Sequence, residues 1–261
     1  MDVFEVITNR RSHRGEFRNT PIVDVDLEKI IEAARWAPSP FNVQPWELLI
    51  IQEEHSKIEL AKLTEQAIIK QFKDKQFLED NARWMCTSDE EWQTRGDGVL
   101  LSDHVTLPKL FQTLPKKLTG NILRALLNNI SSLSILGHLG IGKMPAKEIA
   151  IQVEESPLLI LVVMNTKRRP PGDGGNRWMW LSVGMFIQNM LLAASSLNIG
   201  IQFISAPLES DEDREKIRTL FNFGENHEVM TLLRLGYMNS DDVNSVRINS
   251  SEFIHYEKYM D

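Results

Sequence analysis

The chain of 261 residues contains one cysteine, Cys86, and this scarcity excludes both an intramolecular disulfide framework and a metal site built from several thiolates. It also lacks an excess of positive charge, because 36 acidic residues outnumber 29 lysines and arginines and give a net charge of -7. Nonspecific binding of nucleic acid needs a basic face that displaces counterions from phosphates, so we expect no nucleic-acid partner. A chain with one thiol suits a reducing compartment, and we expect a cytoplasmic location.

Signals for secretion and for membrane insertion are also lacking. Acidic Asp2 and Glu5 stand where a signal peptide carries its basic region, and no apolar core follows them. Residues 178–197 run without a charge for the length of a membrane-spanning helix, but serine, asparagine and glutamine dilute the segment. We therefore expect a buried core helix and no membrane association.

Common catalytic motifs are missing as well. The sequence contains no HExxH, no Walker A and no GxSxG motif, and its six histidines lack the spacing of metal ligands. The stretch GDGGN at residues 172–176 is rich in glycine but follows KRRPP instead of a strand, so it predicts a loop. We expect no metal site, and an enzyme without an evident nucleophile or base would depend on a cofactor.

The hydrophobic pattern that is present predicts a mixed α+β fold. Helical spacing of apolar residues predicts helices near residues 3–10, 26–37, 55–75, 121–136 and 178–197, with further helices from Pro145 and from Ser210. Short apolar and β-branched runs predict strands near residues 47–52, 156–164, 200–205 and 228–237. Four strands among more numerous helices, without a regular βαβ repeat, favour an α+β layer over a doubly wound sheet.

Two helix starts carry capping signals. Asp24 or Asp26 is the candidate N-cap of the second helix, which Pro38 ends. Ser210, with Asp213 three residues later, is similar to a capping box in which Asp replaces Glu.

Residues 80–120 fit neither the helical nor the strand period, so we predict an irregular excursion from the core that can act as a lid. Its tryptophans, Trp84 and Trp92, can stack on an aromatic substrate or can pack within the lid or an interface. The sequence leaves both interpretations open.

Three arginines stand within five residues of this acidic chain, and we call residues 10–14 the arginine segment. Arg10, Arg11 and Arg14 surround Ser12 and His13. Guanidinium groups match phosphate oxygens in pairs, and a serine hydroxyl adds a further donor, so a phosphate site is one interpretation. The other is that the arginines offset the dipole of the preceding helix and remain solvated.

The stretch APSPFNVQPW connects the second helix to the first strand, and we call residues 38–44 of it the proline loop. Pro38, Pro40 and Pro45 stiffen the backbone by fixing φ. Asn42 and Gln44 each supply a donor and an acceptor, which suits either the edge of a heterocycle or the backbone groups of an irregular connection.

Taken together, RRSHR, APSPFNVQPWELLII, GMFIQNMLLAASSLNIG and LLRLGYM resemble the FMN-dependent nitroreductase family. The resemblance implies an α+β fold with a central, mostly antiparallel sheet flanked by helices. It also implies a single FMN-binding domain over residues 1–261, with an insertion or lid at about 80–120, and a homodimer with FMN sites at the subunit interface. In that arrangement the proline loop lines the isoalloxazine ring of the site on the other chain.

The same resemblance implies which residues bind the cofactor. Ser12 and the neighbouring arginines would hold the FMN phosphate, and the backbone N–H groups of Ser205 and Ala206 would lie near flavin N5. The implied cofactor-binding residues are Arg10, Arg11, Ser12, Arg14, Pro38, Ser39, Pro40, Asn42, Gln44, Ser205, Ala206 and Arg247. No catalytic side chain is implied.

The implied activity is hydride transfer from NADH or NADPH through FMN to a small aromatic or quinone-like oxidant, such as a nitroaromatic. Two alternatives remain: an FMN-binding sensor or carrier without turnover, and a specialised reductive enzyme of the same fold. The sequence departs from the family pattern at Pro40 and Pro207, which have no backbone N–H, and at Gly15 and Glu16, which place Phe17 one residue late.

Overall fold

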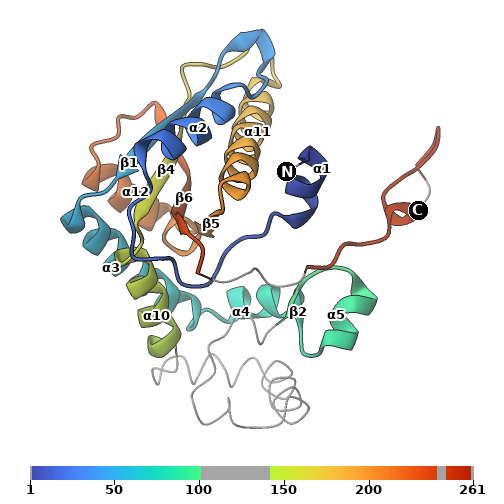
Figure 1. Cartoon of the computed structure of the whole chain (residues 1–261), viewed down its shortest axis with the longest axis horizontal. Coiled ribbons are helices and arrows are strands. Elements are labelled where there is room, and N and C mark those ends of the chain that lie inside the picture. Colours follow the sequence, from blue (N-terminus) through green and yellow to red (C-terminus); the bar gives the residue numbers. More distant parts are fainter. Residues whose placement is uncertain (1, 101–141, 240–244, 260–261) are drawn as a thin grey trace. The chain divides into compact units, whose positions relative to one another are not determined.

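The computed structural model describes residues 2–100, 142–239 and 245–259. The chain divides into two compact units, the first formed by Met1–Ala67 and Glu148–Val243 and the second by Ile68–Lys147 and Asn244–Asp261 (Figure 1). Whether the two units act as a single domain, as the sequence predicts, stays a prediction.

The first unit is built on a four-stranded sheet. Its order is β1 (Trp46–Ile51), β4 (Leu158–Asn165), β6 (His227–Tyr237) and β5 (Ile199–Ile204), and each neighbouring pair is antiparallel. Each strand lies within two residues of its predicted range. The prediction of an α+β fold with a central antiparallel sheet is therefore confirmed.

Strand β4 is the centre of this sheet. Its residues from Leu158 to Met164 are at most 1% exposed, because the strand is paired on both edges and covered on both faces. Alternate side chains of a strand point to opposite faces, so a continuous apolar run is what two covered faces require.

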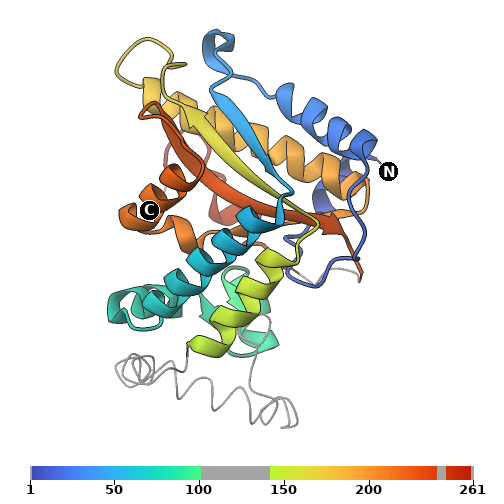
Figure 2. The same cartoon turned by 90° about the vertical axis from the view of Figure 1, so that its left-hand side faces the viewer.

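A layer of helices covers each face of the sheet, as Figure 2 shows. Helices α2 (Asp24–Arg35) and α11 (Gly175–Ser196) cover the face that carries Leu158, Ile160 and Val162. The opposite face packs against residues of α3 (Glu54–Gln71), α10 (Lys143–Glu154) and α12 (Asp211–Leu220), namely Leu60, Ala61, Ala150, Val153 and Ile217.

The start of α2 differs from the prediction. Its N-cap is Val23, which makes no side-chain cap, and both candidate aspartates lie within the first turn. Asp26 instead accepts a hydrogen bond of 2.9 Å from the Tyr237 hydroxyl, which lowers the pKa of Asp26 below its usual value. The local pattern predicts that Asp24 or Asp26 caps the helix, but the carboxylate of Asp26 is bonded to Tyr237, which is distant in sequence.

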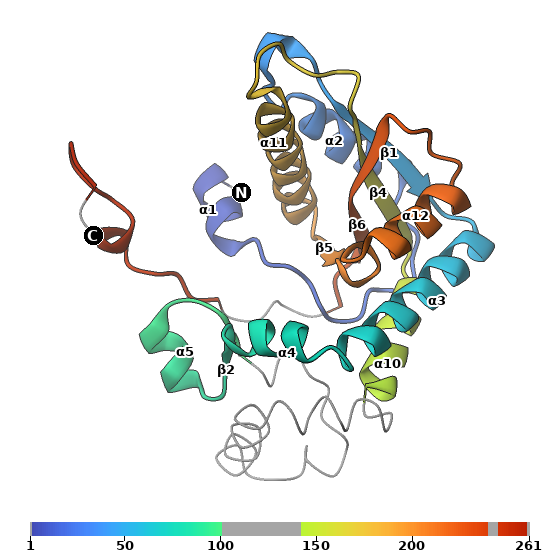
Figure 3. The same cartoon turned by 180° about the vertical axis from the view of Figure 1, so that it is seen from behind.

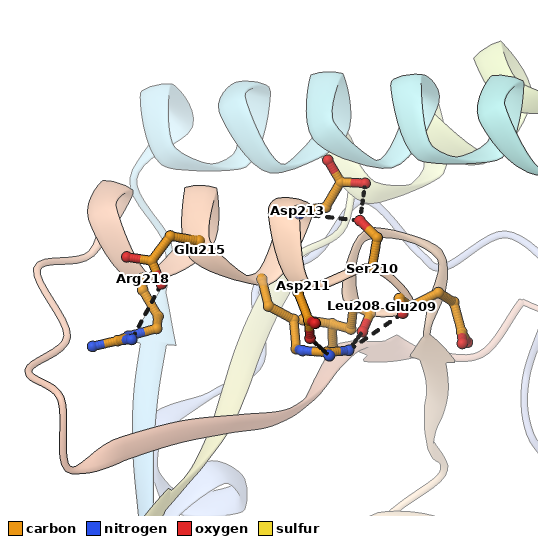
Figure 4. Close-up of polar contacts among 8 residues, drawn as sticks. Leu208, Glu209, Ser210, Asp211, Asp213, Glu215 and Arg218 are labelled. Carbon is orange, nitrogen blue, oxygen red and sulfur yellow. Dashed lines mark hydrogen bonds and ion pairs between the residues drawn. The ribbon is translucent and has the colours of Figure 1, made fainter.

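The start of α12 follows the predicted capping pattern in part (Figure 4). Ser210 Oγ accepts the backbone N–H of Asp213 at 3.1 Å, so Ser210 is the N-cap. The carboxylate of Asp213 then accepts a hydrogen bond of 2.8 Å from the Ser210 hydroxyl instead of the Ser210 backbone N–H.

Helix α11 is buried on one side only, which corrects the expectation of a fully buried helix. Val183, Phe186 and Met190 lie in the core. Four large apolar side chains on its other side are exposed by 37–58%, namely Trp178, Trp180, Leu181 and Met185. Among the helices that the structure describes, none combines the length and the apolar character needed to cross a membrane.

In the second unit, residues 80–100 are more regular than predicted. They include the end of α4 (Lys75–Ala82), then α5 (Asp89–Arg95) and the two-residue strands β2 (Met85–Cys86) and β3 (Val99–Leu100). Elements this short span too few residues to show a hydrophobic period. The rest of the predicted lid, residues 101–120, and the helix predicted at 121–136 lie outside the described residues.

Candidate functional site

The arginine segment extends the sheet at its β5 edge. Helix α1 (Val3–Asn9) ends before Arg10, whose backbone is extended. Ser12 then forms an isolated parallel bridge with Ile201, and the His13 N–H donates to the Ile201 carbonyl at 3.0 Å. The segment is therefore held against β5 by its backbone, independently of its side chains.

His13 determines which way this extended segment faces. Its side chain is 1% exposed and stacks on Phe17, with ring centroids 5.2 Å apart. A Cβ on Gly200 would stand 2.6 Å from the His13 Cβ, so the close approach requires glycine there. Because neighbouring side chains of an extended chain alternate in direction, Ser12 and Arg14 point away from the core.

The side chain of Arg11 is bonded to the C-terminal end of α1. Its Nη1 donates to the carbonyls of Thr8, at 2.6 Å, and Arg10, at 2.9 Å. A cation at these carbonyls offsets the helix dipole, as the alternative interpretation of the arginines expects. Arg10, Ser12 and Arg14 stay candidates for a phosphate site.

Sequence reasoning missed Arg234, which lies behind this segment. It is 2% exposed, and its Nε and Nη2 donate to Gln202 Oε1 at 2.5 Å and to the Gly15 carbonyl at 2.7 Å. Burial lowers the pKa of Arg234 to about 10. The available signal was one arginine inside the apolar strand pattern EVMTLLRLGY.

The proline loop holds a strained shape through its own hydrogen bonds. Phe41, Asn42 and Gln44 have φ values of 54°, 52° and 46°, in the left-handed region that residues with a Cβ seldom adopt. The Gln44 N–H donates to Ser39 Oγ at 3.0 Å, and Gln44 Nε2 donates to Asn42 Oδ1 at 3.0 Å. Strain of this kind is concentrated at functional sites and persists only where surrounding structure enforces it.

The base of the proline loop is anchored to the sheet. The Asn165 N–H donates to the Pro45 carbonyl at 2.7 Å, and Arg168 Nη1 donates to the Gln44 carbonyl at 3.2 Å. Trp46 stacks on Phe186 of α11, with centroids 4.9 Å apart. The loop is therefore presented from a rigid base.

Ser205 and Ala206 follow the edge strand β5. Ser205 is exposed, and Ala206 opens a short 3-10 turn, Ala206–Leu208, in which Pro207 is buried. The Leu208 N–H closes this turn on the Ser205 carbonyl at 2.8 Å. This turn and the arginine segment are thus both attached to β5.

The registers of the sheet separate the arginine segment from the proline loop (Figure 3). Ser12 lies beside Ile201, level with Leu158 at the start of β4, whereas Trp46 after the loop is level with Met164 near its end. Four strand spacings, about 19 Å, and six residues along a strand, about 20 Å, put the two motifs roughly 28 Å apart. One chain therefore does not bring them together.

Arg247 belongs to the second unit. It is exposed, and its Nη1 donates to the Val246 carbonyl at 2.6 Å and to the Ser245 hydroxyl oxygen. Its implied role beside the arginine segment stays a prediction. In the part of the chain that the structure describes, no group of three or more His, Cys, Asp or Glu side chains could hold a metal ion.

The first unit is thus an antiparallel sheet between two helical layers. A basic segment lies on one edge of the sheet, and a strained polar loop lies at the far corner. The model of the Nitroreductase family matches residues 7–237. The chain therefore belongs to the nitroreductase family, and the resemblance seen in its motifs is confirmed.

The match to an individual relative covers a smaller part of the chain than the family model does. YdgI of Bacillus subtilis, which is named as an NAD(P)H nitroreductase, is 37% identical over 62 residues, or 24% of this chain and 30% of that relative. The match thus spans under a third of the length of this curated relative.

Solved structures with similar folds cover nearly the whole chain. NADPH:FMN oxidoreductase from Vibrio harveyi, complexed with NAD+, has a TM-score of 0.60 and 15% identity over 99% of this chain and 78% of that one. Iodotyrosine deiodinase bound to FMN and 3-iodo-L-tyrosine has a TM-score of 0.55 and 16% identity, covering 99% and 100% of the two chains. At such identities, these likenesses show the fold.

Strain in the proline loop is testable through Phe41, whose side chain is 80% exposed. We expect Phe41→Gly to raise the free energy of unfolding by about 0.5–1 kcal/mol, because glycine adopts positive φ without a steric penalty. Urea denaturation measures the change. Phe41→Ala is the matched control, since it removes the ring but keeps the Cβ and the strain; equal stabilities of the two variants would contradict the strained conformation.

Proposed function

We propose that the protein is an FMN-dependent oxidoreductase that uses NADH or NADPH and works as a homodimer with an FMN site at each end of the subunit interface. The observation that carries the proposal is the separation of the two motifs to opposite corners of one sheet. A second copy of the chain is the simplest source of a proline loop beside an arginine segment. We also propose a cytoplasmic location, which the single buried thiol of Cys86 supports.

The donors of the arginine segment fit the phosphate of FMN. Guanidinium groups at Arg10 and Arg14 and the Ser12 hydroxyl offer charge and hydrogen bonds on one short extended stretch. The net charge of -7 means that an anion must be bound by such a local cluster and not by the overall field. Arg247 would join this set.

The proline loop fits the edge of the flavin ring. The side-chain amides of Asn42 and Gln44 can both donate and accept. Inside the loop, Ser39 Oγ holds the backbone N–H of Gln44, and Gln44 Nε2 donates to Asn42 Oδ1. A pre-shaped loop loses little conformational entropy when it meets a ligand. Pro38, Ser39 and Pro40 would form the rest of this wall.

An apolar surface on the first unit supports the homodimer. Helices α1 and α11 are in contact and expose Val3, Phe4, Ile7, Trp178, Trp180, Leu181 and Met185. Large exposed apolar side chains on two helices that touch are typical of an interaction site. We propose that this surface meets its counterpart on the second chain.

FMN, when bound, would supply the redox chemistry by accepting a hydride at N5 and delivering it to an oxidant. The chain's own residues would bind and orient the cofactor: the arginine segment would neutralise the phosphate, and the proline loop would hold the ring. Backbone N–H groups of Ser205 or Ala206 would stabilise negative charge on the ring. Pro207 has no N–H and is excluded as a donor. We assign no catalytic side chain.

The similar proteins support this activity. The Vibrio harveyi structure is an NADPH:FMN oxidoreductase, and YdgI is named as an NAD(P)H nitroreductase. We therefore propose a nitroaromatic or quinone as the oxidant. A specialised reductive enzyme is the second candidate, favoured by the fold shared with iodotyrosine deiodinase, which binds a halogenated aromatic.

The test of the proposed function is the visible spectrum of FMN-loaded protein, recorded without oxygen before and after NADPH or NADH is added. Rapid bleaching of a retained flavin band would support an oxidoreductase, and recovery of the band on adding menadione, nitrofurazone or 3-iodotyrosine would rank the oxidants. A retained band that neither nucleotide bleaches would instead favour an FMN-binding protein without turnover. Failure to retain FMN would overturn the proposal.

We expect Arg14→Ala to weaken FMN binding on the order of 10- to 100-fold, because it removes a charge-assisted hydrogen bond to phosphate. Titration of flavin fluorescence measures the affinity. Arg35→Ala is the matched control, since Arg35 pairs with Glu32 on the surface of α2. Equal FMN affinities for the two variants would remove Arg14 from the phosphate site.

We expect Leu181→Glu to convert the dimer to a monomer that loses FMN, because it places a charge in the proposed apolar interface. Light scattering gives the mass, and absorbance at the flavin band gives the cofactor content. Ile151→Glu, at a residue of α10 that is 40% exposed, serves as the control. A Leu181→Glu monomer that still carries FMN would contradict an interface site.

A further inference from the structure

Arg234 is a buried cation that has no role in the function proposed above. It lies in β6 with 2% of its surface exposed, and within the described part of the chain its guanidinium donates to two neutral acceptors, Gln202 Oε1 and the Gly15 carbonyl. Among the described residues, no carboxylate forms an ion pair with it. Because burying an unpaired charge is costly, and an apolar side chain of similar volume is often at least as stable, stability does not account for an arginine here.

Arg234 contacts residues 15–17, which directly follow the arginine segment. Besides its bond to Gly15, the guanidinium carbon lies 4.6 Å from the ring centroid of Phe17. Phe17 in turn lies close over Gly236, where an added Cβ would approach the Phe17 ring to 2.5 Å. One side chain therefore holds both the Gly15–Glu16 peptide and the aromatic ring that covers Gly236 of β6.

This segment crosses from one strand to the next between two backbone attachments. At its start, Ser12 and His13 are bonded to β5, and at its end Phe17 bridges Met238 while the Arg18 N–H donates to the Tyr237 carbonyl at 2.8 Å. Residues 14–16 span the gap. The bond from Arg234 to the Gly15 carbonyl orients the Gly15–Glu16 peptide plane within that span, one residue after Arg14.

We propose that Arg234 is a positioning residue for the phosphate site: it fixes the direction of Arg14 through the Gly15 peptide and thereby sets the preference for phosphorylated flavin over riboflavin. This inference rests on the proposed function. Residues 14–16 form the span between the two backbone attachments, and Gly15 lies at its middle. The planar fork of arginine can restrain it because it bonds Gln202 and Gly15 at once and still lies over Phe17.

The test compares the dissociation constants of FMN and of riboflavin for the wild-type protein, Arg234→Met and Arg234→Lys, by fluorescence titration. We expect Arg234→Met to weaken FMN on the order of tenfold or more and riboflavin by less than about threefold, because only FMN uses the phosphate donors. Arg234→Lys keeps the charge but not the fork, so the FMN-to-riboflavin preference should also fall. Urea denaturation of each variant shows whether it is folded.

The outcomes separate this inference from the proposed function. If the wild-type protein binds no FMN, both the function and the inference fall. If it binds FMN and a folded Arg234→Met variant keeps the wild-type preference, the inference alone is wrong. Should Arg234→Met not fold, Arg234→Lys decides: a wild-type preference overturns positioning by the fork, and a reduced preference supports it.

Discussion

The complete burial of β4 is the constraint on which the rest of the structure depends. A strand with apolar side chains on both faces must be paired on both edges and covered on both sides, so β1 and β6 flank it and two helical layers enclose it. With β5 added beyond β6, the sheet acquires two edges of different character. The proline loop leads into one edge, and the arginine segment lies along the other, at the opposite corner.

That separation explains why the first unit carries features that make little sense within one chain. These features are an exposed apolar surface on α1 and α11, a strained polar loop, and a basic segment that lies far from that loop among the described residues. They become consistent if a second copy supplies the missing half of each site. Local strain and buried polar groups then serve the site instead of the stability of the monomer.

Much of the fold could be predicted because its main elements carry strong local patterns. The apolar run of β4, the long uncharged stretch of α11 and the β-branched strands all lay close to their predicted ranges. The failures have different causes. A distant contact overrides a local signal where the Tyr237 hydroxyl bonds to the carboxylate of Asp26, and the uncharged sequence of α11 does not mark the side of the helix that is exposed. Residues 80–100 form elements too short to show a period.

By itself, the sequence determined the family motifs, the strand-forming runs and the side-chain chemistry available for a phosphate and a heterocycle, since each depends on residues near one another along the chain. Only the tertiary structure decided where these groups lie: that Arg11 turns back on α1, that Arg234 stands behind Gly15, and that the two motifs occupy opposite corners. Strand order and register set those positions. They arise from pairing and burial between segments up to about two hundred residues apart, such as Gly15 and Arg234, which no local pattern encodes.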